Sequence, residues 1–452
     1  MQEFESRTSG LLFSGDMVAF IGSLLVTLLI RYQEIPTTDI VAQHLGPFSM
    51  LFVLWAAIFL IAGLYDQYVS FDRRGIPRLV LKTQFVNMLL AGVLFFVLPL
   101  GITPKTNLVI YLFVSTLFIV VWRLYLYPAI AAKRSIQALV LGSGPEAAGV
   151  MRVLERNPYF KQVEVQQIDT QTWADAAVIG KELRTYVSTH DVEMIVADMN
   201  TETARKLASV FFELAFTDRS VRFFSLPEFY EQLHHRIPPS LVGESWILEK
   251  ISVRSPHYAY SFLKRLSDIC GALVLMVPNI IIFPLVIAAI KLQDGGPIFY
   301  RSERVGQFNK PIHILKFRTM SGMDSGTATL DSTHVVTRLG MFLRKTRIDE
   351  LPQLWNILRG DISFIGPRPE MPGRAQVYME KIPYYNMRHL IKPGLSGWAQ
   401  INHFDVPRNE VDVEKTIDKL SFDLYYLRHR SFFLDMEIIL KTVNAVLSRT
   451  GT

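Results

Sequence analysis

One stretch decides how this chain is arranged about a membrane: ICGALVLMVPNIIIFPLVIAAI, residues 269–290. It has enough apolar residues to cross a bilayer, which takes a helix of roughly 17–25 residues. Two features argue against crossing. Pro278 and Pro284 each remove a backbone donor and favour a kink, and basic residues on both flanks leave the positive-inside rule without a preference. We therefore expect a re-entrant helix, over residues 262–292 or so, that bends at the prolines and returns.

Four further apolar segments occupy the first third of the chain, at residues 11–30, 48–64, 85–101 and 108–126. Each approaches the length of a membrane-spanning helix, so residues 1–134 are predicted to form a four-helix transmembrane domain. Two of the segments contain a charged residue. We expect Asp16 to lie near one end of its helix, close to water, and Arg123 to extend its guanidinium towards the interface.

Basic residues between the apolar segments predict their orientation. They gather after the second segment and after the fourth, at Arg73, Arg74, Arg78, Lys82, Lys133 and Arg134. By the positive-inside rule, the N-terminus and everything after residue 130 face the cytoplasm. The first ten residues do not resemble a cleavable signal peptide, so we expect the first apolar segment to be kept as an anchor.

Composition narrows the class of partner. Half of the 452 residues are hydrophobic, which is rare in a soluble protein of this size. The net charge of +6 suits anionic lipid headgroups or phosphate-bearing substrates better than duplex DNA, so no nucleic-acid partner is expected. The single cysteine, Cys270, excludes an intrachain disulfide, and we expect it to be a small buried hydrophobe.

Short apolar strands alternate with amphipathic stretches in residues 135–250. We predict strands at 137–142, 163–168, 193–198 and 221–226, and helices at 145–156, 179–190 and 203–216. This alternation predicts a doubly wound, Rossmann-like α/β domain with a parallel sheet. Its first turn, 142–147 (GSGPEA), resembles a dinucleotide-binding turn. No acidic residue ends a clear second strand, Asp169 being the nearest, so glycines needed only for tight packing stay the alternative.

An adjacent acidic pair, Asp349 and Glu350, lies within residues 343–361, LRKTRIDELPQLWNILRGD. The pair precedes Pro352 and an apolar-periodic run, where a helix begins. Acidic residues at such a position commonly cap the helix, which is one interpretation. The other is an active site, because nearby cations keep a carboxylate ionised and can also hold a diphosphate. Those cations are Arg344, Lys345, Arg347 and Arg359.

Three more basic stretches strengthen the second interpretation. Lys316 and Arg318 alternate in KFRTM, residues 316–320, which places both on one face of a strand. Arg368 is framed by prolines in GPRP, residues 366–369, so its direction is fixed, and Lys392 begins the turn-rich KPGLSGWAQ, residues 392–400. Together with the acidic pair, these stretches are suited to binding a nucleotide diphosphate with a divalent metal.

The motifs at 264–269, 296–306, 316–320, 347–353, 366–369 and 392–400 resemble, in this order, those of the bacterial sugar transferases. These are the monotopic phosphoglycosyl transferases, or polyprenyl-phosphate hexose-1-phosphate transferases. The resemblance covers about residues 262–452, and the regions before it resemble the large subgroup that primes exopolysaccharide or capsule repeat units. In one departure, Phe283-Pro284 stands where the family's re-entrant helix often has Ser-Pro, so the break rests on the prolines.

The resemblance implies a reaction and roles. Asp349 matches the nucleophile that takes the sugar phosphate from a UDP-sugar, after which undecaprenyl phosphate attacks to give a lipid diphosphate sugar. Glu350, with Asp349, is implied to hold Mg²⁺. With the cations beside the pair added, the expected substrate-binding residues are Lys316, Arg318, Arg344, Arg347, Arg368, Asp423 and Asp435.

Three domains are therefore expected: a membrane bundle at 1–134, a Rossmann-like domain at 135–250, and an α/β catalytic domain with the re-entrant helix at 251–452. The implied location is a bacterial inner membrane, with the catalytic domain in the cytoplasm. The sugar is not specified, although the subgroup suggests glucose or galactose, and homo-oligomerisation stays open. The alternative function is a non-catalytic membrane regulator of polysaccharide assembly that senses a nucleotide through the βαβ domain.

Overall fold

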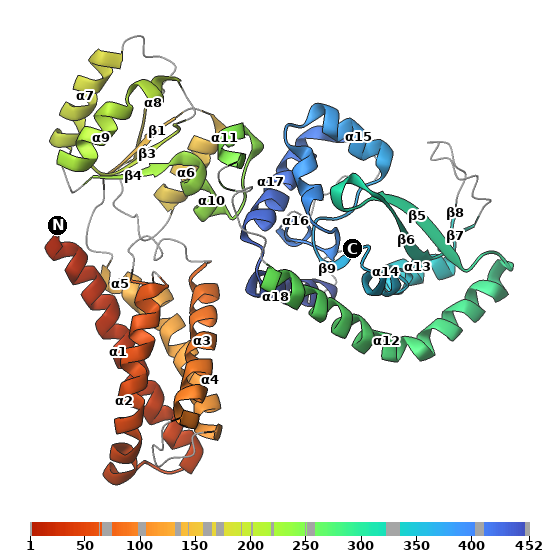
Figure 1. The fold of residues 1–452 in the computed structure, drawn as a ribbon, viewed down its shortest axis with the longest axis horizontal. Helices are drawn as coiled ribbons and strands as arrows, with labels where there is room; N and C mark the ends of the chain where they lie inside the picture. Colours follow the sequence, from red (N-terminus) through yellow and green to blue (C-terminus); the bar gives the residue numbers. More distant parts are fainter. Residues whose placement is uncertain are drawn as a thin grey trace. The chain divides into compact units, whose positions relative to one another are not determined.

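The computed structural model describes residues 2–62, 64–65, 75–97, 105–131, 137–142, 144–156, 165–168, 176–190, 192–199, 202–217, 221–248, 250, 258–321, 335–402 and 411–447. The chain divides into two compact units, Met1–His234 and His235–Thr452 (Figure 1). The first unit holds a helical bundle and a parallel sheet, and the second holds the acidic pair.

Long apolar helices form the bundle. They are α1 (Gln2–Tyr32), α2 (Thr38–Ile61), α3 (Gly75–Val97) and α4 (Lys105–Val121), continued by a π-helical turn (Trp122–Leu126) and α5 (Tyr127–Ala131). Four spans, Gly10–Tyr32, Thr38–Leu60, Ile76–Phe95 and Asn107–Ile130, are long and apolar enough to cross a membrane. Phe20, Phe52, Trp55 and Tyr111 pack against one another in the core, with the ring centroids of Trp55 and Tyr111 5.1 Å apart. The four predicted apolar segments are thus confirmed as helical where the structure describes them, and residues 98–101 of the third lie outside the described residues.

All four bundle helices begin before the apolar segments that predicted them, and α2 and α3 show why. In α2 the helix continues through Pro47, because Ile40 and Val41 before it also pack against the bundle core. In α3 the helix begins at Gly75, so Arg78 and Lys82 lie in its first turns and not in a loop as we expected. Long basic side chains are tolerated there because their stems cover apolar surface while their charged ends reach the interface.

Our expectation for Asp16 and Arg123 was wrong. Asp16 is fully buried and Arg123 is 3% exposed. The Arg123 Nε and Nη2 donate to the two Asp16 carboxylate oxygens at 3.2 and 2.5 Å, and Nη1 donates to the Leu64 carbonyl at 2.6 Å. The ion pair forms because two charges within an apolar bundle gain more by meeting each other than by reaching separately for water. It fastens α1 to the π-helical turn and to the end of α2.

We predict that Arg123→Met destabilises the bundle, because Asp16 would be left as an uncompensated buried charge, a change that typically costs about 3–5 kcal/mol. The measurement is thermal unfolding of the detergent-purified chain. The double variant Asp16→Asn/Arg123→Met removes both charges and should recover much of the lost stability. A single variant that melts like the wild type would contradict the prediction.

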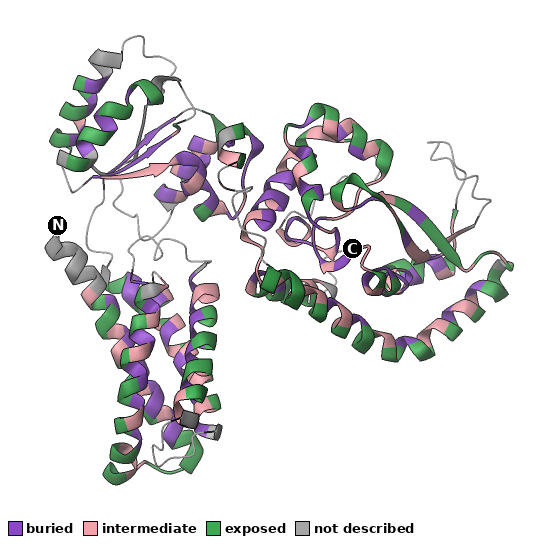
Figure 2. Cartoon of the chain, viewed as in Figure 1, coloured by how far each residue is buried: buried purple, intermediate pink, exposed green. Residues whose placement is uncertain are grey.

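The sheet of the first unit is parallel, as predicted. Its strands are β1 (Gln137–Leu141), β2 (Val165–Ile168), β3 (Val192–Ala197) and β4 (Arg222–Ser225), in the order β2-β1-β3-β4. The associated helices are α6 (Pro145–Arg156), α7 (Ala176–Thr189), α8 (Glu202–Lys206), α9 (Ala208–Thr217) and α10 (Leu226–His234). Figure 2 shows β1 and β3 buried. This order matches the start of the flavodoxin-like order and not of the classic dinucleotide-binding one, so the Rossmann-like assignment stays a prediction.

The glycine turn after β1 has one conformationally demanding position. Gly144 has a φ of +97°, a left-handed value that L side chains rarely adopt. At Gly142 an added Cβ would meet its nearest neighbour, the Leu226 Cδ2, at an ordinary 3.4 Å. The left-handed backbone conformation therefore explains why residue 144 is glycine. At residue 142 no close contact among the described residues requires a glycine, so the structure does not favour the alternative that Gly142 is needed for tight packing.

The second unit is an α/β domain built on short strands. Its strands are β5 (Phe299–Val305), β6 (Pro311–Phe317), β7 (Met320–Ser321), β8 (Val335–Val336), β9 (Ser363–Ile365) and β10 (Gly394–Ser396). Its helices are α11 (Glu244–Ile247), α12 (Tyr258–Asp294), α13 (Arg338–Lys345), α14 (Gln353–Arg359), α15 (Pro372–Lys381), α16 (Trp398–Asn402), α17 (Val413–His429) and α18 (Phe432–Leu447). β5 pairs with β6 antiparallel, and β9 with β10 parallel.

Residues 235–247, which we had placed with the preceding domain, contribute to the core of the second unit. Ile237 and Val242 are buried in the same cluster as Trp398 and Tyr425. The Ile237 N–H donates to the Ser421 carbonyl of α17 at 2.8 Å. This segment therefore packs on α17 before the chain reaches α12.

The helix α12 is continuous over 37 residues and contains both prolines. Figure 1 shows it bending near its middle. One face packs on the rest of the unit, through Ala272 on one side of the prolines and Ile290 on the other. The opposite face is apolar and exposed, and it includes Val274, Val277, Ile280, Ile281 and Leu285 (Figure 2). Cys270, which we expected to be buried, is exposed as well, since the domain packs on Gly271 and Ala272 instead.

Candidate active site

Asp349 lies in a 3₁₀ turn, Ile348–Glu350, between α13 and α14. Its side chain is only 8% exposed, and its Oδ1 has no hydrogen-bond partner among the described residues. Burial, and then the neighbouring Glu350 carboxylate, raise the pKa of Asp349, against the opposing charges of Lys316, Arg347 and Arg344. The structure thus places a desolvated carboxylate with one unpaired oxygen beside three cations.

Glu350 has the opposite electrostatic environment. Lys316, from β6, donates its Nζ to the Glu350 Oε1 at 2.7 Å, and the Arg347 guanidinium lies 3.9 Å from Oε2. Burial raises the pKa of Glu350, but the charges of Lys316 and Arg368 outweigh it, so the net shift is downward. The two adjacent carboxyl groups therefore differ: the surrounding charges favour the anionic form of Glu350, whereas burial disfavours the anionic form of Asp349.

The capping interpretation of the pair is not supported. The N-cap of α14 is Pro352, which makes no side-chain cap bond, and α14 itself has only seven residues. Instead, Arg347, at the start of the 3₁₀ turn that carries the pair, adopts a left-handed backbone with φ 59°. Such a conformation is strained for a residue with a side chain, and it turns the chain so that Asp349 and Glu350 leave the end of α13 in a tight turn.

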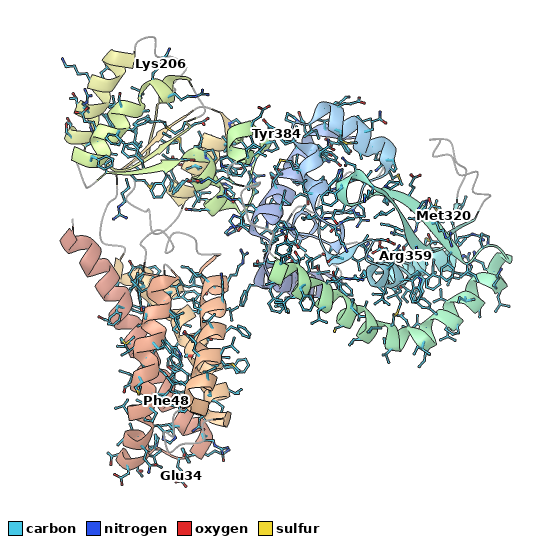
Figure 3. All side chains as sticks on the ribbon, viewed as in Figure 1. Glu34, Phe48, Lys206, Met320, Arg359 and Tyr384 are labelled. Carbon is cyan, nitrogen blue, oxygen red and sulfur yellow. The ribbon has the colours of Figure 1, made fainter. Side chains whose placement is uncertain are left out.

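Four of the predicted cations surround the pair. Lys316, Arg344, Arg347 and Arg368 are all among the charges that shift the pKa of Asp349 or Glu350. Arg344, in the last turn of α13, also donates its Nε to the Thr319 hydroxyl at 2.9 Å. Arg359, at the end of α14, is exposed (Figure 3).

Arg318 is placed differently from Lys316. The strand β6 ends at Phe317, so Arg318 lies just outside it. Its Nε donates to the carbonyl of Met320, which Figure 3 labels, at 2.9 Å, and its Nη1 lies 3.5 Å from the Pro297 carbonyl. A Cβ at Gly296 would meet this guanidinium at 1.6 Å. In this conformation Arg318 fastens the turn after α12, and its contact with a substrate stays a prediction.

The two later acidic residues are engaged in buried ion clusters. Asp423, on α17, lies 2.9 Å from the Nη2 of Arg388 and is 1% exposed. Asp435, on α18, accepts hydrogen bonds from Tyr260, Lys264 and Tyr426 at 2.7–2.8 Å. Neither carboxylate is therefore placed beside the acidic pair by a described contact, and their predicted substrate contacts stay untested.

Close backbone approach explains the two turn-rich motifs. The Gly394 N–H donates to the Pro367 carbonyl, and the Gly366 N–H donates to the Ser396 carbonyl, both at 2.9 Å. A Cβ at Gly394 would meet the Gly366 nitrogen at 2.0 Å, and one at Gly366 would meet the Lys392 carbonyl oxygen at 2.4 Å. Only glycine allows the two chains to approach this closely. The motif at 392–400 thus holds the loop that carries Arg368.

Polar residues that the sequence did not single out hold the site in place. Asn356 of α14 accepts from the Leu315 N–H at 3.0 Å and donates to the His313 carbonyl at 2.8 Å, so it joins α14 to β6. Arg265 of α12 donates to the carbonyls of Ile357 and Leu358, both at 2.6 Å. Asp268 accepts from Ser363 and from the Phe364 N–H. The only available signal for the α12 residues was their membership of the motif at 264–269.

The side chains of this site that could hold a divalent metal are the two carboxylates of the pair. The unpartnered, buried Oδ1 of Asp349 fits a cation ligand, since Mg²⁺ prefers one or two carboxylate oxygens together with substrate phosphates. Within the described ranges, no group of three or more His, Cys, Asp or Glu side chains converges.

A family model described as bacterial sugar transferase matches residues 259–449. A UDP-N-acetylgalactosamine-undecaprenyl-phosphate N-acetylgalactosaminephosphotransferase of Aeromonas hydrophila is 40% identical over 202 residues, which cover 43% of this chain and 46% of that protein. An uncharacterized sugar transferase of Bacillus subtilis is 41% identical over 190 residues, covering 42% and 89%. A UDP-glucose:undecaprenyl-phosphate glucose-1-phosphate transferase of Escherichia coli is 39% identical over 185 residues, covering 40% and 39%. The match spans less than half the length of the first and third relatives.

The opposite pKa shifts of the pair predict opposite effects on stability. Because the folded pKa of Asp349 is raised, its ionised form destabilises the native state, and Asp349→Asn should raise the melting temperature at pH 7. Because the folded pKa of Glu350 is lowered, its ionised form stabilises the native state, and Glu350→Gln should lower that temperature. Both differences should shrink as the pH falls and the wild-type carboxyl groups become protonated. Melting curves of the three proteins between pH 4 and 8 test this, and effects of the same sign would contradict it.

Proposed function

Because this chain belongs to the bacterial sugar transferase family, we propose that it transfers a sugar 1-phosphate from a UDP-sugar to undecaprenyl phosphate. The observation that carries the proposal is the buried, unpaired Asp349 oxygen beside a lysine-paired Glu350. The Aeromonas and Escherichia relatives, which are named for transfer from a UDP-sugar to undecaprenyl phosphate, support the substrate class. We further propose that the product starts an exopolysaccharide or capsule repeat unit.

The proposed chemistry has two displacement steps at phosphorus. In the first, an Asp349 oxygen bonds to the sugar-bearing phosphorus, the bond from that phosphorus to the bridging oxygen breaks, and uridine monophosphate leaves. In the second, an oxygen of undecaprenyl phosphate attacks the same phosphorus, and the Asp349 carboxylate is released. A covalent intermediate suits a soluble donor and a lipid acceptor, because each can bind in turn.

The surroundings of Asp349 fit this role. A desolvated carboxylate without a hydrogen bond on Oδ1 is more nucleophilic than a solvated one, and its raised pKa reflects the same lack of stabilisation. Lys316, Arg344, Arg347 and Arg368 would neutralise the diphosphate, which supplies most of the barrier reduction in phosphoryl transfer. We propose that Asp349 and Glu350 also hold Mg²⁺, which when bound would neutralise further charge on the diphosphate.

We propose that α12 is re-entrant. A straight helix of 37 residues would be about 55 Å long, nearly twice the thickness of the hydrocarbon core. Residues on both sides of Pro278 and Pro284 pack on the same domain, through Ala272 and Ile290. If α12 crossed the membrane, the residues before and after the prolines would lie on opposite sides of the bilayer and could not both contact this domain. Asn279, next to Pro278, donates its side-chain amide N–H to the Leu275 carbonyl at 2.6 Å.

We predict that Asp349→Asn lowers the transfer of labelled sugar phosphate to undecaprenyl phosphate by at least about a thousandfold, because the nucleophile is lost. Glu350→Gln should retain some activity and respond more weakly to added Mg²⁺. Glu380→Gln, an exposed acidic side chain on α15, is the matched control and should transfer normally. Normal turnover by Asp349→Asn would refute the nucleophile and favour the regulatory alternative.

The same assay identifies the sugar. Purified protein is offered labelled UDP-glucose, UDP-galactose and UDP-N-acetylgalactosamine in parallel, and lipid-linked label is counted for each. We expect glucose or galactose to be the best donor. Preferred transfer of N-acetylgalactosamine would correct that choice, and no transfer from any of the three would contradict the proposed donor class.

The topology is tested by labelling. A single cysteine introduced at Gln307, in the turn between β5 and β6 of a Cys270→Ser chain, should react with an impermeant maleimide only after inside-out vesicles are prepared. The reason is that a re-entrant α12 keeps both of its ends in the cytoplasm. Labelling of intact spheroplasts at this position would show that α12 crosses the membrane.

A further inference from the structure

Four charged residues lie behind the loop that carries Arg368, and we call them the buried quartet: the buried Arg388, Lys419 and Asp423, and Glu370, whose side chain is 14% exposed. Arg388 and Asp423 form an ion pair at 2.9 Å, with both side chains at most 2% exposed. Lys419 donates to the Glu370 carboxylate, and the Arg388 Nη1 lies 3.9 Å from the same oxygen. Two cations thus balance two anions. Burial raises the pKa of Glu370, but Lys419 and Arg388 lower it to about 2.

The quartet meets the backbone of the Arg368 loop directly. The Arg388 Nη2 donates to the Arg368 carbonyl at 2.9 Å. Two residues after Arg368, the side chain of Glu370 is held by Lys419, and the Glu370 carbonyl accepts from the Val305 N–H at 2.9 Å. Before Arg368, the loop is fixed by the backbone hydrogen bonds from the 394–396 segment. The peptide that bears the Arg368 side chain is therefore held on both sides.

We propose that Arg388, itself oriented by Asp423, is a positioning residue for Arg368. By fixing the Arg368 carbonyl, it sets the direction from which the Arg368 guanidinium approaches the diphosphate of the nucleotide sugar. This step rests on the proposed function. It also assigns Asp423 a role that does not require contact with the substrate: the carboxylate acts through Arg388.

The geometry of Arg388 argues for positioning over mere stability. The Arg388 Nη2 forms an ion pair with Asp423 and donates a hydrogen bond to the Arg368 carbonyl. The Arg388 Nη1 donates to the Tyr385 hydroxyl at 2.8 Å. A planar guanidinium provides these directions at once, whereas a lysine carries a single nitrogen. Buried ion pairs are often no more stabilising than apolar side chains of similar volume. The stability of the fold alone would therefore not require an arginine at position 388 that donates to the Arg368 carbonyl.

The test uses Arg388→Lys in the full-length, detergent-purified protein. Lysine keeps a positive charge beside Asp423, so the melting temperature should stay within a few degrees of the wild type. It lacks the second nitrogen of the guanidinium, so the hydrogen bond to the Arg368 carbonyl should be lost. The value of kcat/KM should fall about tenfold, mostly through a higher KM for the UDP-sugar. Hydrogen exchange should become faster in the peptide covering residues 364–371, where the loop is no longer held.

Asp418→Asn is the matched control, because it breaks a different ion pair on the same helix α17, that of Asp418 with Arg236. Its exchange at residues 364–371 should stay at the wild-type rate. Wild-type kcat/KM in Arg388→Lys, or unchanged exchange at 364–371, would overturn the positioning role. If the wild-type protein transfers no sugar phosphate, the proposed function fails instead, and the exchange measurement still decides whether Arg388 holds the loop.

Discussion

The ion pair between Lys316 and Glu350 joins the end of β6 to the turn that carries Asp349, at 2.7 Å. This ion pair neutralises Glu350 and leaves the neighbouring Asp349 carboxyl buried without a paired cation among the described residues. Without that lysine, two carboxylates in one turn would both resist ionisation. With it, Glu350 is a stable anion, and Asp349 alone has the raised pKa and the unpaired oxygen. The remaining contacts of the domain serve to keep this turn, β6 and the Arg368 loop in register.

That register is maintained by polar side chains of α12, α14 and α18. Asn356 ties α14 to β6, Arg265 and Asp268 tie α12 to α14 and β9, and Asp435 gathers Tyr260, Lys264 and Tyr426 from two helices. The apolar helix α12 is thereby attached to the domain by charges at its first turns and by packed side chains farther along. An enzyme that joins a soluble donor to a lipid acceptor needs such an attachment, because the site must stay at a constant depth relative to the membrane.

The helices that a pattern within one segment indicates were predicted from the sequence. The ion pairs between segments far apart in the chain were missed. Apolar runs located the bundle helices and α12, and α6 was predicted to the residue, because each signal lies within one segment. The starts of α2 and α3 were missed, since Pro47 and Lys82 look like breaks until their neighbours are seen to pack. The acidic pair and Lys316 carried motif signals. Arg123 and Arg388 carried none, because their partners come from segments far away in the chain, and only folding brings those charges together.

The buried quartet has a consequence for how the protein responds to ionic strength. Counterions screen exposed charges over about 8 Å at physiological salt but reach buried pairs much less. Arg388, Lys419 and Asp423 are almost completely enclosed, whereas the Arg347 side chain is 48% exposed. Added salt should therefore weaken the attraction of the site for a diphosphate without loosening the scaffold that aims Arg368. Both the buried ion pairs and the binding of a diphosphate depend on electrostatic attraction. Only the binding of the diphosphate, however, depends on the salt concentration of the solvent.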